Sequence, residues 1–174
     1  KAWLSQQKEP VGILSVERPY NANIEFFVAG EKKTFNIYGL IDRVDRIGDK
    51  TRVVDYKSGK VAPEKMKFAG GRQKLEPLEK LVNTIKKGHE KHMLQLLFYA
   101  YLIKNNFGYL PDDLSIISFI NYPDEGLKFN QDNSDIQLYV DLLPEALGIA
   151  FEELFDMNVP FKHDPKSLYC TYCS

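Results

Sequence analysis

Two neighbouring stretches, Gly39-Leu-Ile-Asp-Arg-Val-Asp-Arg46 and Val53-Val-Asp-Tyr-Lys-Ser-Gly59, decide the fold of this chain. Both are rich in β-branched and other strand-favouring residues. Gly48-Asp49, which lies between them, is typical of a two-residue turn. The sequence therefore predicts an antiparallel hairpin with a short connection.

The register of this hairpin brings charged side chains together. In a hairpin that is symmetric about the turn, Ile47 faces Lys50, and counting outward places Asp42 opposite Asp55. Lys57 is two residues beyond Asp55, so its side chain shares the same face. A three-residue loop would shift the register by one and separate these groups.

Two facing carboxylates with a neighbouring ammonium are a poor arrangement for folding alone. Directly opposed side chains have Cβ atoms roughly 4.5–5.5 Å apart, where like charges destabilise a sheet. Mg²⁺ typically binds one or two carboxylates together with waters and phosphate oxygens. Asp42, Asp55 and Lys57 therefore predict metal-assisted hydrolysis of a phosphodiester. The alternative is a solvated face with a cross-strand Asp–Lys ion pair.

These motifs resemble the core of a known family. Gly-x-Ile-Asp-Arg-x-Asp followed by Val-Asp-Tyr-Lys-Ser-Gly is similar to the PD-(D/E)XK nucleases, in particular their RecB/AddB-type exonuclease branch. Asp42 matches the first acid, with Ile41 where the family name has Pro. Asp55-Tyr56-Lys57 matches (D/E)-x-K. Gln95-Leu-Leu-Phe-Tyr99 matches a further family motif, Gln-x-x-x-Tyr, on the following helix.

The resemblance implies a restriction-endonuclease-like α/β fold, with a mixed central β-sheet flanked by α-helices. It implies a Mg²⁺- or Mn²⁺-dependent DNA exonuclease, acting in repair or recombination with a helicase domain or subunit. Asp42 and Asp55 would hold the metal, Lys57 and Gln95 would join the catalysis, and Gln95 and Tyr99 would contact DNA. A catalytically silent domain that binds DNA or a partner is the alternative. For Gln95 and Tyr99, that alternative is a buried polar pair tying helix to sheet.

An acid at the end of the first expected strand is a further candidate. Related nucleases often carry an acid near the position of Glu17, which would place it at the edge of the metal site. Pairing with Arg18 or Arg43 is an equal alternative. The resemblance also implies a metal ligand on an upstream helix, which we expect to lie before Lys1.

Cys170-Thr-Tyr-Cys173, near the end of the chain, is a further motif outside the hairpin and helix motifs. A C-x-x-C pair supplies half of a zinc or iron–sulfur site. In AddB-type nucleases, cysteines after the nuclease core help to hold an iron–sulfur cluster. The chain has only two cysteines, so such a cluster would need a longer chain, and an unligated thiol pair is the alternative. His89-Glu-Lys-His92 lacks the spacing of a zinc protease motif.

Length and composition limit the number of domains and the class of protein. The 174 residues, 44% of them hydrophobic, are enough for a single domain over residues 1–174, with residues 160–174 as a cysteine-containing tail. The first residue and the late cysteines suggest a fragment of a longer protein. The sequence shows neither a transmembrane run nor a signal peptide, so no membrane partner and a cytoplasmic location are expected.

The net charge of −1, from 23 basic and 24 acidic residues, gives no global support for DNA binding. Basic residues do cluster locally, and such clusters either line a phosphate track or form a solvated face. The clusters are Lys57, Lys60, Lys65, Lys67, Arg72 and Lys74, and Lys86, Lys87, Lys91 and Lys104.

Periodicity and turn residues predict the remaining elements. Strands are expected over Val11–Glu17, Ile24–Val28, Phe35–Ile47, Thr51–Tyr56 and Leu114–Asn121, with a loop or short strand over Asp124–Asn130. Helices are expected over Leu75–Lys87, Lys91–Lys104 and Leu142–Phe155, and a polar loop over Pro63–Lys74.

Overall fold

The computed structural model describes residues 10–66, 75–88, 90–120, 126–129, 135–158 and 160. One mixed sheet has the strand order β1-β2-β3-β4-β5. Only β3 and β4 are parallel neighbours. The strands are β1 (Val11–Val28), β2 (Glu31–Ile47), β3 (Lys50–Lys57), β4 (Asp113–Ser118) and β5 (Leu127–Lys128). The helices are the 3-10 turn η1 (Pro63–Met66), α2 (Pro77–Lys87), α3 (Lys91–Phe107) and α4 (Asp135–Phe155). The predicted mixed sheet with flanking helices is confirmed.

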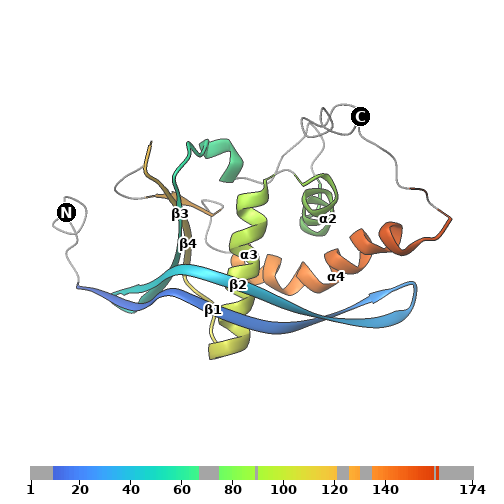
Figure 1. Ribbon diagram of the computed structural model, residues 1–174, viewed down its shortest axis with the longest axis horizontal. Helices are drawn as coiled ribbons and strands as arrows, with labels where there is room; N and C mark the ends of the chain where they lie inside the picture. Colours follow the sequence, from blue (N-terminus) through green and yellow to red (C-terminus); the bar gives the residue numbers. More distant parts are fainter. Residues whose placement is uncertain are drawn as a thin grey trace.

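A long hairpin of β1 and β2 extends from the sheet along the bottom of Figure 1. Its turn is Ala29-Gly30, and both residues have positive φ, of 50° and 79°. The prediction of two separate strands, Val11–Glu17 and Ile24–Val28, is wrong because β1 is continuous. The polar residues between those segments, such as Asn21 and Asn23, lie on the exposed face of the strand. They therefore carry no signal of a chain break.

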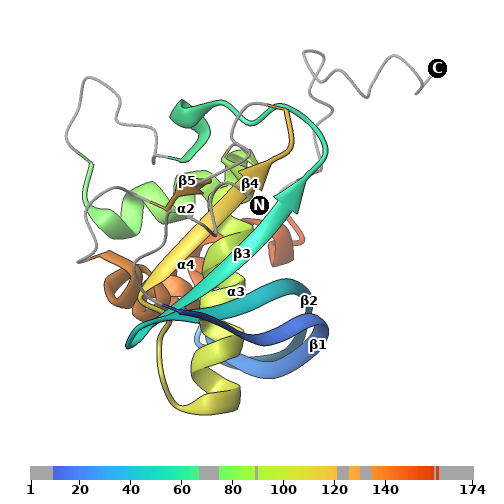
Figure 2. The same cartoon turned by 90° about the vertical axis from the view of Figure 1, so that its left-hand side faces the viewer.

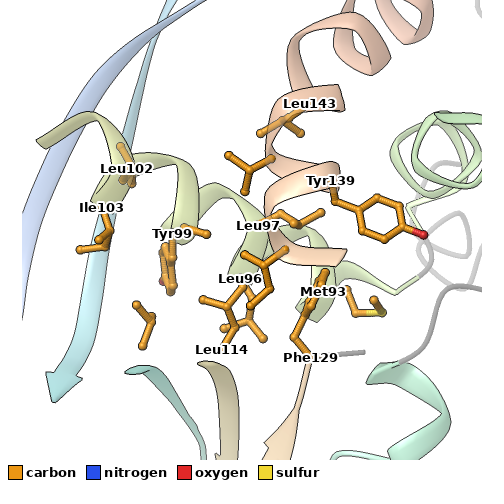
Figure 3. Packing of buried hydrophobic residues seen from close by; sticks show 14 of the residues in the cluster. Met93, Leu96, Leu97, Tyr99, Leu102, Ile103, Leu114, Phe129, Tyr139 and Leu143 are labelled. Atoms are coloured by element: carbon orange, nitrogen blue, oxygen red, sulfur yellow. The ribbon is translucent and has the colours of Figure 1, made fainter. Parts of the chain in front are cut away.

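The helices cover one face of the sheet. In Figures 1 and 2, α2, α3 and α4 all lie on the same side of β3 and β4, and α4 runs alongside the β1–β2 hairpin. Leu96 and Leu97 of α3 are completely buried and lie between Leu114 of β4 and Leu143 of α4 (Figure 3). Burial of such a side chain contributes about 1.5–3 kcal/mol. The core thus holds α3 against the part of the sheet that carries Asp42 and Asp55.

Two helices are longer than predicted. α3 continues three residues beyond Lys104 and ends at Gly108, whose φ of 75° suits glycine, and whose N–H donates to Lys104 O. α4 starts at Asp135 and not at Leu142. Pro144 lies inside it, although proline is most common in the first turn of a helix. The turns of α4 that precede Pro144 are stabilised by burial of Ile136 and Tyr139. This burial outweighs the preference of proline for the first turn of a helix.

Candidate active site

β2 and β3 separate at the predicted carboxylates. Their pairing runs from Ile47 and Lys50 to Arg43 and Val54 in the predicted register and ends there, so the predicted Asp42–Asp55 strand pair does not form. β3 continues to Lys57 with only β4 beside it. The Tyr56 N–H therefore lacks a strand partner on the β2 side and donates instead to Oδ2 of Asp42, at 2.7 Å. We call the point where β2 and β3 separate, beyond Arg43 and Val54, the fork. The hydrogen bond between Asp42 and Tyr56 bridges it and marks the centre of the site.

The core-facing side of the hairpin changes at this fork. Gly39 faces α3 and Ile41 belongs to the hydrophobic core, and after the fork Val44 belongs to the same core although it is three residues from Ile41. Alternation in a regular strand would make residues two apart share a face. On β1, Glu17 has a φ of 46° and lies between the residues that pair with Arg43 and Ile41. A positive φ costs a residue other than glycine on the order of 1–3 kcal/mol and re-aims the strand.

Four polar side chains gather beside the fork. Lys57 Nζ lies 2.7 Å from Asp55 Oδ2 and donates to Gln95 Oε1 at 2.9 Å. Gln95 Nε2 donates to Asp55 Oδ1 at 3.0 Å and to the Tyr99 hydroxyl at 2.7 Å. The structure thus brings together Asp55, Lys57, Gln95 and Tyr99 from β3 and α3, which are far apart in the sequence. For Gln95 and Tyr99, the predicted shared helix face is confirmed.

The environment of Asp55 opposes its negative charge. Its side chain is only 3% exposed, and burial raises the pKa of the carboxyl above its ordinary value, with the Lys57 hydrogen bond and charge opposing the shift and the Asp42 charge adding to it. Oδ2 contacts the Lys57 ammonium at 2.7 Å. A carboxylate oxygen has two lone pairs, so this contact leaves an acceptor site on Oδ2 that suits a cation.

A divalent cation fits these residues. Asp42 and Asp55 are close enough for the charge of one to raise the pKa of the other. Two carboxylates with room for water and phosphate oxygens are the ligand set that Mg²⁺ prefers. No third acid, histidine or cysteine joins them in a metal-binding group within the described ranges. Glu17 is exposed and has no ion-pair partner in that part of the chain, so pairing with Arg18 or Arg43 is not observed.

The second acid of the first motif has a structural role that the sequence did not reveal. Asp45 is fully buried and accepts two hydrogen bonds from Arg52, at 3.0 and 2.8 Å. Arg43 Nη2 lies 3.0 Å from the same carboxylate, and its guanidinium sits over the Tyr56 ring at 5.4 Å. Asp45 therefore ties β2 to β3 on the face opposite Asp42.

Gly39 is a further residue that pattern reasoning missed. A Cβ at this position would lie 2.7 Å from Leu102 Cδ1 and 3.2 Å from Tyr99 Cε1. The absence of a side chain lets α3 approach β2 closely enough to bring Tyr99 beside the fork. Its place at the start of the Gly-x-Ile-Asp motif is the only sequence signal of this role.

Several other candidates fall outside this site. Two lysines of the second basic cluster are ion-paired on the surface: Lys86 with Glu153 at 3.3 Å, and Lys104 with Asp141 at 2.7 Å. These pairs favour a solvated face. Residues 67–74, His89, Cys170 and Cys173 lie outside the described residues, as does most of the 160–174 tail. No helix in the described ranges is long and apolar enough to cross a membrane.

Comparison with known proteins adds the following. The sequence model of the PD-(D/E)XK nuclease superfamily matches residues 1–174. A search of curated proteins found no match. Among solved structures, the crystal structure of SSO0001 is similar, with 17% identity and a TM-score of 0.35. The alignment covers 99% of this chain and 60% of that protein.

Proposed function

The chain belongs to the PD-(D/E)XK nuclease superfamily, most of whose members are metal-dependent nucleases, and from this we propose that it hydrolyses phosphodiester bonds of DNA with Mg²⁺ or Mn²⁺. One observation carries the proposal. The buried Asp55 carboxylate lies between the Lys57 ammonium and the Gln95 amide, next to Asp42.

Each residue has a role that follows from its contacts. Asp42 and Asp55 would hold the cation, which when bound supplies a Lewis acid for the phosphate and a more acidic water. A cation on Asp55 would compete with Lys57 for the same oxygen. Lys57 would then have a donor available for a phosphate oxygen or the attacking water. Gln95 would keep Lys57 and Asp55 at their present spacing through its hydrogen bonds to both.

The finer assignment rests on the sequence motifs. Similarity of Asp42, Asp55-Tyr56-Lys57 and Gln95-Leu-Leu-Phe-Tyr99 to the RecB/AddB branch supports an exonuclease that works with a helicase in repair or recombination. Under this assignment, Gln95 and Tyr99 contact the DNA strand, and Glu17 borders the metal from the neighbouring strand. An iron–sulfur cluster on Cys170 and Cys173 would require cysteines from a longer chain.

Hydrolysis of linear and circular DNA in Mg²⁺ tests the proposal. Wild type should release nucleotides from linear DNA and leave closed circles intact. Lys57→Ala should lower the rate about 10²–10³-fold, the usual cost of one transition-state contact. Lys50→Ala is the control, because Lys50 is exposed and lies at the opposite end of β3 from Lys57.

DNA binding measured in Ca²⁺ separates chemistry from affinity. Lys57→Ala should bind DNA nearly as well as wild type, since one phosphate contact among many is a small share of the affinity. Gln95→Ala should weaken both binding and rate. Equal cleavage by wild type and Lys57→Ala would refute the assigned mechanism. Tight binding without any cleavage by wild type would favour the catalytically silent domain.

A further inference from the structure

A groove runs away from the candidate site between β2 and α3. It has a volume of about 470 Å³ and is lined on one side by residues 37–40 of β2 and on the other by α3 residues that include Gln95, Phe98 and Tyr99. Gln95 and Tyr99 also belong to the hydrogen-bonded cluster around Asp55. The groove is therefore continuous with the place where the scissile phosphate would lie.

The chemistry of the groove differs from that of the fork. None of its described lining residues is charged, so it offers nothing to balance a phosphate. Tyr38, Phe98 and Tyr99 supply aromatic rings, and Leu40 and Leu102 supply apolar surface. Volumes of about 300–1,000 Å³ with mostly apolar walls are typical of sites for small organic groups. A flat, uncharged heteroaromatic ring is the part of a nucleotide that fits such walls.

One wall of the groove is also a strand edge. Pairing between β2 and β3 stops at Arg43, and within the described ranges no strand lies beside residues 37–41 on that side. Backbone N–H and C=O groups at an unpaired edge can hydrogen-bond to the edge of a ring. The groove thus combines stacking surfaces with polar groups in its wall, which is the combination that holds a base.

We propose that this groove binds one unpaired nucleobase of the strand being hydrolysed, next to the phosphate at Lys57. The inference rests on the proposed function and adds a substrate feature to it. A base within a duplex is stacked and paired, and it must leave the helix before a protein pocket can enclose it. The groove therefore selects single-stranded ends over paired ends.

Fluorescence of 2-aminopurine tests the proposal directly, because this base analogue is quenched when it stacks. The protein is titrated in Ca²⁺ with a short single strand that carries 2-aminopurine near its end. Tyr38→Ala is the first variant, because this side chain is 69% exposed and its loss should not unfold the protein. Phe98→Leu is the second, since it keeps apolar bulk but removes a ring. Phe27→Ala, at a similarly exposed ring near the hairpin turn, is the control.

Wild type and Phe27→Ala should quench the probe and bind it equally. Tyr38→Ala and Phe98→Leu should lose most of the quenching, and each should bind about 5- to 150-fold more weakly, the range for one lost stacking contact. With an abasic residue in place of the probe, the groove variants should bind as wild type does. A blunt duplex should show none of these differences.

The outcomes separate this inference from the proposed function. If wild type cleaves DNA in Mg²⁺ but both groove variants quench and bind like wild type, the groove does not hold a base, and an apolar peptide segment becomes the better occupant. The nuclease assignment would then still stand. A wild-type protein that neither binds single strands nor cleaves DNA would overturn both.

Discussion

Replacement of Asp45 by alanine should destabilise the protein more than any change to the candidate metal ligands. Its carboxylate is fully buried and receives two hydrogen bonds from Arg52 and the charge of Arg43. The side chains of Arg52 and Arg43 are only 7% and 17% exposed, so water replaces the lost carboxylate poorly. Two largely buried guanidinium groups would lose the carboxylate that both contact.

The expected loss follows from these contacts. Removing one partner of a buried ion pair costs about 3–5 kcal/mol, because the remaining charge is left uncompensated. For a chain of this size, 1 kcal/mol shifts the melting temperature by about 2–4 °C, so Asp45→Ala should melt about 6–20 °C below wild type. Asp49→Ala, at the exposed hairpin turn, should change the free energy of unfolding by less than about 0.5 kcal/mol.

Urea unfolding followed by circular dichroism, without divalent metal, measures both variants against wild type. The slope of free energy against urea should stay constant, so that the midpoints report stability alone. A loss below about 1 kcal/mol for Asp45→Ala would refute the structural role assigned to the Asp45–Arg52 pair.

The remaining predictions concern the fork itself. Gly39→Ala should slow hydrolysis at least about tenfold, because the added Cβ displaces Tyr99 and Leu102. Gly59→Ala is the control, because a Cβ there meets nothing within 4 Å. Equal rates for Gly39→Ala and wild type would show that the close approach of α3 to β2 at Gly39 does not position Tyr99 for hydrolysis. The second prediction concerns pH. Since burial raises the pKa of Asp55, the metal-free native state binds more protons than the unfolded chain above pH 3.8. Stability should therefore fall as pH rises from there through the raised pKa. Asp55→Asn should lack this fall and be as stable as wild type or slightly more so at neutral pH. A large loss of stability in Asp55→Asn, measured by urea unfolding across pH, would instead make Asp55 a structural ion-pair partner.

The sequence predicted the features of the site that are local. Gly48-Asp49 allows only a tight turn, and the flanking strand formers then fix the register through Arg43 and Val54. Spacing of four residues places Gln95 and Tyr99 on one face of α3, whichever way the helix packs. These inferences need only backbone geometry, which explains why they hold.

Features set by tertiary contacts were not predictable in this way. The motif contains Asp42 and Asp45 in similar surroundings, yet one faces the fork and the other is buried against Arg52. A spacing of three residues puts the two acids on opposite faces of β2, but it does not tell which face meets Arg52 and which meets the fork. That depends on how the sheet packs against α3, which the strand pattern alone does not show.

Calorimetric titration with Mn²⁺ at neutral pH tests the central claim most directly, because it needs neither DNA nor catalysis. We expect one cation per protein in the wild type, with affinity weakened at least about tenfold in Asp42→Asn and in Asp55→Asn, since each removes a charged ligand. Asp49→Asn should bind Mn²⁺ as wild type does. Equal Mn²⁺ binding by wild type, Asp42→Asn and Asp55→Asn would contradict the claim that these two carboxylates form the metal centre.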